Sequence, residues 1–280
     1  GQSTSQTQSI KVLRNTSKVT LSGIVTDSPI ANAQVTAQAG QTSVQVQAGN
    51  DGTYLIELEV DETETEQLVM LSARGSEANN QTHIEFKSLL PSTTSLKRLA
   101  GEDGILNKEE SFAVNVTNVS TAEFALLNQL GLPNNEADLS SRLLGVDAEQ
   151  KLALATLIKA VVDHGIELPT GVDSTLELIN NTQVSAQLTE SIEQSDPELL
   201  DSILEDIKAD SELLSGLRGD IVGDYFINSP NYYTNQAIHI KLEAGGVAQL
   251  SASNQVTAQW RLDGSNVEII FDEQQPFYLW

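Results

Sequence analysis

The feature that most constrains the fold is the spacing of apolar residues, which changes twice along the chain. Up to about residue 98, apolar and polar residues alternate, as they do on a half-buried β-strand. From about residue 99 to 218 apolar residues recur every three or four positions, which is typical of amphipathic helices, and from residue 219 alternation returns. The pattern predicts a multidomain α+β protein: an N-terminal antiparallel β-sandwich, a central helical bundle, and a C-terminal antiparallel sheet or partial barrel.

Six short alternating segments make up the predicted sandwich, residues 18–98. They cover residues 19–25, 33–37, 44–46, 54–60, 68–71 and 83–86. Turn-forming groups such as Asp27-Ser28-Pro29 and Gly49-Asn50-Asp51-Gly52 separate them. Six or seven short strands at this spacing are typical of two packed antiparallel sheets.

Three motifs in this segment carry a family resemblance. They are Gly23-Ile24-Val25-Thr26-Asp27, Ala31-Asn32-Ala33-Gln34-Val35 and Asp51-Gly52-Thr53-Tyr54. Together they resemble the carboxypeptidase regulatory-like (transthyretin-like) β-sandwich. The residues suit that fold, because Gly23 permits close approach of the first strand and the Asp51-Gly52 turn directs Tyr54 into the core. The resemblance implies a non-catalytic spacer or recognition module of exported proteins, and it brings no catalytic residues with it.

Helix-capping signals subdivide the predicted helical domain, residues 99–218. Helix starts are predicted at Ser120-Thr121-Ala122-Glu123, at Asp147 and at Asp196-Pro197-Glu198, with a weaker helical stretch over residues 176–192. Gly131 and Gly165 predict the ends of the first two helices. The phrases at 99–106 and 114–122 resemble proteobacterial envelope proteins to which no activity is attached.

The last predicted domain, residues 219–280, combines alternating segments with turns at Gly245-Gly246 and Asp263-Gly264. Gly223-Asp224-Tyr225-Phe226 and the later hairpin with Trp260 and Asn266-Val267-Glu268-Ile269 resemble bacterial lipocalin-like domains. An eight-stranded barrel needs more strands than this segment supplies. We therefore expect either an open sheet or a fragment of a longer domain.

Composition restricts the class of protein further. Asp and Glu outnumber Lys and Arg by 39 to 15, which gives a formal net charge of −24, and the chain contains no Cys. Disulfides, cysteine nucleophiles and cysteine metal sites are therefore excluded. Because nucleic-acid binding requires a basic surface, we expect no nucleic-acid partner. The acidity, the absence of Cys and the high Asn, Gln, Ser and Thr content predict an exported protein of a Gram-negative bacterium, periplasmic, outer-membrane-associated or at the cell surface.

Residues 1–17 begin with a polar, uncharged run, Gly1-Gln2-Ser3-Thr4-Ser5-Gln6. Such a run buries too little apolar surface to order itself, so we predict a flexible tether. It resembles the stretch that follows a removed signal peptide or lipidated cysteine, and an ordinary frayed terminus is the alternative. Membrane association is expected only through such a removed N-terminal lipid anchor.

No catalytic constellation can be assembled from the sequence. His83, His164 and His239 are the only imidazoles, and no G-x-S-x-G nucleophile motif occurs. Acidic residues over 196–212 recur at helical spacing, which indicates a solvated helix face, with a calcium surface as the alternative. We expect a protein that is not an enzyme and that uses no metal and no cofactor.

Most of the aromatic residues lie after residue 219. Core filling explains such a cluster, but exposed rings could also stack on a ligand. The candidate ligand-binding residues are Tyr225, Tyr232, Tyr233 and Trp260, with a glycan, a lipid or an envelope protein as the partner. The sequence thus favours a non-catalytic binding or adhesion-type module of the cell envelope. The alternatives are a structural subunit that assembles through sheet edges and an enzyme of unknown class.

Overall fold

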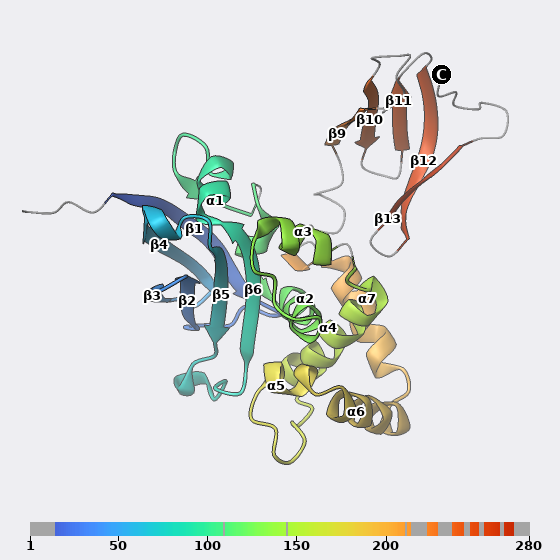
Figure 1. Cartoon of the computed structure of the whole chain (residues 1–280). Helices are drawn as coiled ribbons and strands as arrows, with labels where there is room; N and C mark the ends of the chain where they lie inside the picture. The colour runs from blue at the N-terminus through green and yellow to red at the C-terminus, as the bar shows by residue number, and fades with distance from the viewer. Residues whose placement is uncertain are drawn as a thin grey trace, which may run out of the picture.

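The computed structural model describes residues 15–108, 110–143, 145–210, 212–213, 223–228, 237–243, 247–251, 255–263 and 266–271. Strands come first, helices follow, and strands return after residue 222 (Figure 1). Apart from the two-residue strands β7 and β8, which follow helix α1, strands and helices occupy separate stretches of the chain, and the predicted α+β class is confirmed.

Two sheets form the N-terminal part. One has the order β4-β1-β7, with β8 also paired to β1, and the other has the order β3-β2-β5-β6. Their strands are β1 (Thr16–Thr26), β2 (Gln34–Ala39), β3 (Thr42–Gln47), β4 (Thr53–Asp61), β5 (Leu68–Arg74), β6 (Glu85–Ser92), β7 (Ile105–Leu106) and β8 (Val116–Thr117). The six predicted strand segments are confirmed.

The expectation of purely antiparallel sheets is wrong for the sheet that contains β1. Strands β7 and β8 both run parallel to β1, so this sheet is mixed. Each of the two strands has only two residues, which is too short to show any periodicity in the sequence. They follow a helix and a loop that carry the chain back across the sandwich, and such a crossover permits parallel pairing.

The inward side chains of the two sheets meet in one core. Leu21, Ile56, Val35, Leu71 and Phe86 are each 0% exposed. Strand β4 alternates strictly between exposed and buried positions, as a strand with one solvated face must. Each such buried side chain contributes about 1.5–3 kcal/mol relative to an exposed one.

Gly23 and Tyr54 occupy the positions expected from the sequence. Tyr54 is buried, and its hydroxyl donates a hydrogen bond to the carbonyl oxygen of Val114. A Cβ at Gly23 would clash with the same carbonyl and would lie 2.9 Å from the Tyr54 hydroxyl oxygen. The absence of a side chain at residue 23 therefore makes room for the contact between the strand pair β1–β4 and the turn before β8.

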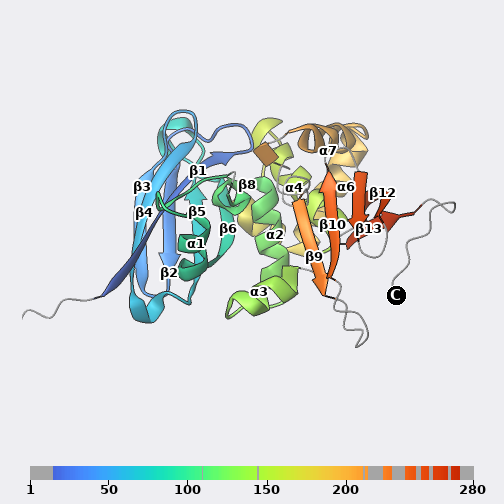
Figure 2. The same cartoon turned by 90° about the horizontal axis from the view of Figure 1, so that it is seen from above.

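Helices pack beside strand β6 and against one another (Figures 1 and 2). They are α1 (Thr93–Leu99), α2 (Asn118–Gln129), α3 (Glu136–Leu143), α4 (Ala148–Asp163), α5 (Thr175–Asn180), α6 (Thr182–Ser195) and α7 (Leu199–Ala209), with short 3-10 turns η1 (Glu62–Glu64), η2 (Glu77–Asn79) and η3 (Phe112–Val114). One continuous cluster of buried apolar residues joins the sandwich to helices α2, α4, α5, α6 and α7. The predicted domain boundary at 98/99 thus lies inside a shared core.

Two predicted helix starts are displaced, and one is confirmed. Helix α2 begins at Asn118, because Thr117 and Ser120 cap it reciprocally: the Thr117 side chain accepts from the Ser120 amide at 3.0 Å and Ser120 accepts from the Thr117 amide at 2.9 Å. Helix α7 begins at Leu199, two residues after Pro197. Asp147 caps α4 as predicted, since its carboxylate accepts from the Gln150 amide at 2.7 Å.

A third sheet has the order β13-β12-β11-β10-β9, and every neighbouring pair is antiparallel. Its strands are β9 (Gly223–Asn228), β10 (Ala237–Glu243), β11 (Val247–Ser251), β12 (Gln255–Asp263) and β13 (Asn266–Ile270). It has its own apolar cluster, built around Ile240, Leu250 and Trp260. Over the described strands the sheet is an open path that ends at β9 and β13. Among the helices that the structure describes, none is long and apolar enough to cross a membrane.

Candidate functional site

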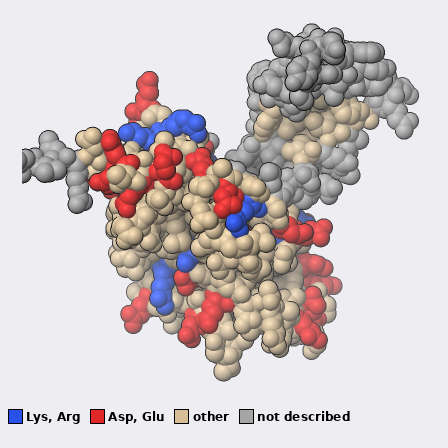
Figure 3. Space-filling view, in the orientation of Figure 1, with Lys and Arg blue, Asp and Glu red and all other residues tan. Residues whose placement is uncertain are grey.

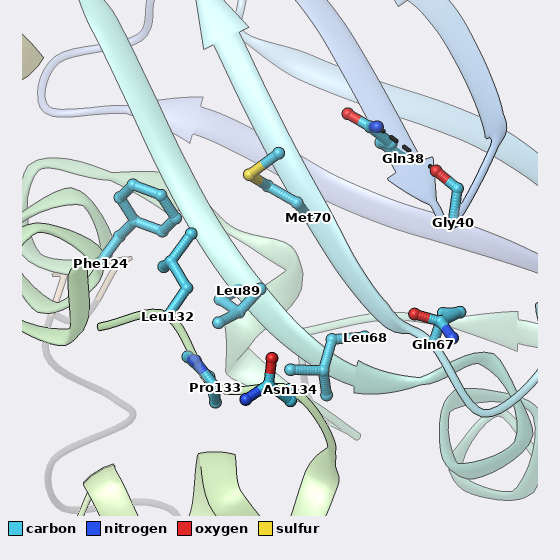
Figure 4. Close-up of a pocket in the computed structure, with 10 residues that line it drawn as sticks. All are labelled: Gln38, Gly40, Gln67, Leu68, Met70, Leu89, Phe124, Leu132, Pro133 and Asn134. Atoms are coloured by element: carbon cyan, nitrogen blue, oxygen red, sulfur yellow. Dashed lines mark hydrogen bonds between the residues drawn. The ribbon is translucent and has the colours of Figure 1, made fainter. Parts of the chain in front are cut away.

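A groove of about 260 Å³ lies on the outer face of the β3-β2-β5-β6 sheet, the face turned away from the sandwich core. Figure 4 shows Phe124, Leu132 and Leu89 together on one side of Met70, and Gln38 on the other. The lining residues come from β2 and the turn after it, from β5 and the residue before it, and from β6, α2 and the α2–α3 loop: Gln38, Gly40, Gln67, Leu68, Met70, Leu89, Phe124, Leu132, Pro133 and Asn134. The groove therefore has an apolar floor and a rim of carboxamides.

Strand register places the floor residues side by side. Gln38 is paired with Met70, and Met70 with Leu89, so their side chains form one row across three strands. Residues 68–71 are all apolar, which departs from the alternation of a strand with one solvated face. Val69 and Leu71 fill the sandwich core, and Leu68 and Met70 supply the floor of the groove.

The α2–α3 loop, residues 130–135, forms one wall of the groove, and helix α3 holds it in place. The Arg142 guanidinium donates to the carbonyl oxygens of Leu130 and Gly131 at 2.6 and 2.7 Å, and it also pairs with Asp138 at 2.8 Å. The Asp138 carboxylate in turn accepts from the Asn134 amide at 3.1 Å. This loop presents Leu132 with 44% of its surface exposed. Leu132 therefore adds exposed apolar surface to the wall of the groove.

Helix α3 is itself tied to the sheet through Glu136. Its carboxylate accepts hydrogen bonds from the hydroxyls of Ser92 and Ser95, both at 2.8 Å. Partial burial opposes ionisation, but these hydrogen bonds outweigh it and lower the pKa of Glu136. The wall of the groove is therefore anchored by a charged group at neutral pH.

The groove carries no charge although the chain has a net charge of −24. None of its ten lining residues is ionisable. In Figure 3 the middle of this face is mostly uncharged surface, with a few Lys, Arg, Asp and Glu side chains on it. A partner that docks here meets an uncharged lining, with two charged groups beside it: the Lys87 ammonium, 5.1 Å from the centre of the Phe124 ring, and the Glu64 carboxylate next to Gly40.

A second feature, buried below the surface, joins the sandwich to helix α4. The Lys159 ammonium donates to the Asp27 carbonyl oxygen at 2.7 Å, to the Asp27 carboxylate at 3.2 Å and to Asp163 at 2.5 Å. The Asp27 side chain is 0% exposed, and its second carboxylate oxygen has no hydrogen-bond partner among the described residues. The Lys159 ammonium is thus shared by two acidic side chains, Asp27 and Asp163, in the interior.

Burial dominates the electrostatics of this cluster. Desolvation raises the pKa of Asp27 to about 7, even though the nearby Lys159 acts in the opposite direction. For Lys159, burial lowers the pKa, but the attraction of Asp27 and Asp163 outweighs burial and raises it. Lys159 therefore stays protonated, its three donors are all used, and the cluster acts as a structural tie rather than as a nucleophile.

The predicted aromatic ligand-binding residues lie only partly within the described chain. Tyr225 on β9 is 38% exposed, whereas Trp260 on β12 is 8% exposed and belongs to the sheet's apolar cluster. The register places both on the same face, with β10 and β11 between them. Tyr232 and Tyr233 lie outside the described residues. The four-residue site stays a prediction.

The three histidines lie in different places: His83 beside the start of β6, His164 at the C-terminal end of α4, and His239 on β10. Among the residues that the structure describes, no group of three or more His, Asp or Glu side chains is arranged to hold a metal ion. His164 lies where a cation would favour the helix dipole, as the sequence indicated.

Sequence reasoning missed both the groove and the buried tie. The unbroken apolar run at 68–71 was a usable signal, because it indicates a strand covered on both faces. Lys159 stands among Ile158, Ala160 and Val161, and a lysine inside an apolar helical run indicates a buried partner.

Comparison of the chain with protein-family models, with curated proteins and with solved structures found no match.

Proposed function

We propose that this chain is a non-catalytic binding or adhesion-type module of the bacterial cell envelope and that the groove between β5, β6 and the α2–α3 loop is its contact site. The observation that carries the proposal is the chemistry of the groove. Ten lining residues without a charge surround an apolar floor, on a chain with a net charge of −24. Apolar pockets with a few fixed polar groups are the usual form of a ligand site.

The size and lining of the groove favour a peptide segment of another envelope protein over the glycan and the lipid. A hollow of about 260 Å³ accommodates one or two apolar side chains rather than an acyl chain. Gln38, Gln67 and Asn134 provide carboxamides, which can both donate to and accept from a peptide backbone. Phe124, the only aromatic residue in the lining, is buried, so it offers little ring surface for stacking on a sugar.

The finer fold assignments belong to the same proposal. The motifs at Gly23 and Asp51 support a transthyretin-like sandwich that acts as the scaffold for the groove. The five-stranded sheet supports a lipocalin-like or partial-barrel domain. The acidity and the lack of Cys support export to the periplasm, the outer membrane or the cell surface of a Gram-negative bacterium.

Selection from a phage-displayed library of random peptides tests the contact site. The biotinylated full chain serves as bait, and the affinity of enriched peptides is measured by fluorescence polarisation. We expect uncharged or basic peptides with an apolar anchor, because acidic peptides are repelled by the chain. Leu132→Asp should weaken their binding at least about tenfold, since it places a carboxylate in the wall of the groove.

Leu130→Asp is the matched control. Leu130 lies in the same loop and is 57% exposed, but it does not line the groove. Its substitution introduces the same charge in the same loop and should leave peptide binding unchanged. Equal loss of binding in both variants, or no loss in either, contradicts the assignment of the groove.

A further inference from the structure

The two edges of the β3-β2-β5-β6 sheet are treated differently by the rest of the chain. At β6 the helices close the edge with side-chain hydrogen bonds. Thr121 accepts from the Lys87 amide at 3.0 Å and Ser120 donates to the Lys87 carbonyl at 2.9 Å. Thr175 accepts from the Glu85 amide at 3.0 Å and donates to the Glu85 carbonyl at 2.8 Å. The outward backbone groups of Glu85 and Lys87 on β6 are thereby satisfied within the chain.

Along the opposite edge, the described part of the chain pairs no further strand with β3, although β4 of the other sheet runs close beside it. The Ala48 amide donates to the Ala33 carbonyl oxygen at 2.8 Å, so these two residues form a hydrogen-bonded pair. Every second pair along the β2–β3 ladder, such as Val35–Val46, is then hydrogen-bonded in the same way. By this alternation the backbone groups of Ser43, Gln45 and Gln47 point away from β2. Their three side chains are exposed, and in the described chain no backbone hydrogen bond is made by these residues outside the ladder.

Strand β3 also lacks the features that normally prevent an edge from pairing. Its sequence, Thr-Ser-Val-Gln-Val-Gln, contains no charge, no proline and no bulge. The neighbouring edge strand of the other sheet, β4, carries Glu57 and Glu59 on its exposed face. Natural edge strands are usually protected by charges or proline, so an unprotected one marks a pairing site.

From these observations we infer that a second copy of this chain pairs with β3, antiparallel, about a twofold axis at Gln45. The strand is self-complementary in this register. Gln45 faces Gln45 of the partner subunit, Ser43 faces Gln47 of the partner subunit, and Val44 faces Val46 of the partner subunit. All the outward backbone groups of the three residues form bonded pairs, the two valines cover each other, and no charges meet although each copy carries −24.

The symmetry of this pairing has a consequence for the groove. A twofold axis between antiparallel strands stands perpendicular to the sheet, so two four-stranded sheets become one of eight strands with both outer faces on the same side. Five interstrand spacings then separate the two β5 strands, which is about 24 Å. The arrangement presents two grooves side by side to one ligand surface, and binding to both grooves at once adds avidity. This gain in avidity rests on the proposed function of the groove. The dimer itself does not depend on what the grooves bind.

Sedimentation velocity over about 1 to 200 µM tests the dimer, since this range brackets a micromolar dissociation constant. We expect the mass to rise from 30.2 kDa toward twice that value. Gln45→Lys should raise the dissociation constant at least about tenfold, because it sets two like charges opposite each other at the axis. Gln34→Lys is the matched control: it adds the same charge on the same exposed face, one strand further in, and should leave the mass unchanged.

Cysteine cross-linking gives an independent readout, because the chain has no Cys of its own. Residues opposite each other in a bonded antiparallel pair have Cα atoms about 5.5 Å apart, within the reach of a disulfide. Gln45→Cys should form a covalent dimer under mild oxidation, and Gln34→Cys should not. A chain that stays monomeric at every concentration and cross-links equally at both positions overturns the inference, as does an extended peptide from the phage library that occupies β3 in place of the second copy.

Discussion

The buried Asp27–Lys159–Asp163 cluster sets a pH dependence that belongs to one residue. The pKa of Asp27 is about 7 in the folded chain and near 3.8 in the unfolded chain, so between these values the folded state binds more protons. The stabilising contribution of the protonated group is fully present below pH 3.8 and is lost as the pH rises through 7. The reason is that ionisation places an incompletely paired carboxylate in the interior.

Asp27→Asn should remove this dependence, because the amide stays neutral at every pH. Between about pH 4 and 7 the free energy of unfolding of the wild type should fall relative to that of the variant by a few kcal/mol. Urea titrations at several pH values measure both curves. Parallel curves for the two proteins would show that Asp27 does not titrate in this range.

Lys159→Met is expected to be far more damaging than Asp27→Asn. It removes the ammonium that donates to the Asp27 carbonyl, the Asp27 carboxyl group and Asp163, and breaking a buried pair in this way costs about 3–5 kcal/mol. Urea unfolding at pH 7 checks the magnitude. Lys151→Met provides a comparison, since its ion pair with Glu123 is more exposed to solvent on the Glu123 side.

Gly23 carries a steric prediction. A methyl group there meets the Val114 carbonyl and the Tyr54 hydroxyl, so Gly23→Ala should destabilise the fold by about 1–3 kcal/mol. At Gly145 the nearest atom to an added Cβ lies 3.4 Å away, so Gly145→Ala should cost much less. The difference in urea midpoint between the two alanine variants is the measurement, and equal midpoints would contradict the close approach at Gly23.

At the scale of single elements, helix α4 depends on its N-cap. Asp147→Ala removes the acceptor for the Gln150 amide and should cost about 1 kcal/mol. Glu149→Ala, in the same first turn, makes no cap and should cost only a few tenths of a kcal/mol. Thermal unfolding of both variants distinguishes a cap effect from a general charge effect. A larger loss in Glu149→Ala would rule the cap out as the main contribution.

Element types followed from the sequence wherever an alternation was long enough to be seen. Strands β1 to β6 each present several inward apolar residues, and they were predicted. Strands β7 and β8 contribute two residues each, and α3 buries little beyond Leu139, so none of the three shows a periodic pattern. The exact start of α2 was missed because Thr117 and Ser120 are both good capping residues, and only the tertiary contacts of Thr121 and Ser120 with Lys87 select between them.

The groove could not be predicted, because it depends on residues far apart in the chain. The apolar run at 68–71 indicates a strand covered on both faces, but the cover comes from Leu132 and Pro133. Their position is set by Arg142 and Asp138 in the next helix. Local patterns therefore reveal half of the site, and the loop that forms the other half is positioned by tertiary hydrogen bonds.

At the scale of the whole molecule, the apolar clusters predict how the chain unfolds. Among the described residues the sandwich and most of the helices share one apolar cluster, whereas the C-terminal sheet has a cluster of its own. A small isolated core gives little stability, so the sheet should unfold at a lower urea concentration than the rest. The larger unit should unfold in one transition despite its two types of secondary structure.

The chain provides its own probes for this prediction. Both Trp residues, 260 and 280, lie in the C-terminal segment, so Trp fluorescence reports on that segment alone, while far-UV circular dichroism is dominated by the helices. The fluorescence midpoint should precede the dichroism midpoint. Coincident midpoints would mean that the five-stranded sheet and the rest of the molecule unfold as one cooperative unit.

The most direct test of the groove as the contact site uses the only methionine of the chain, Met70, which lies on the groove floor. A chain labelled with ¹³C at the methionine methyl group gives one signal from the centre of the proposed site. Titration with the peptide enriched in the phage selection should shift this signal until it saturates, with the same dissociation constant as fluorescence polarisation. Saturable peptide binding that leaves the Met70 methyl signal unchanged would contradict the groove as the binding site.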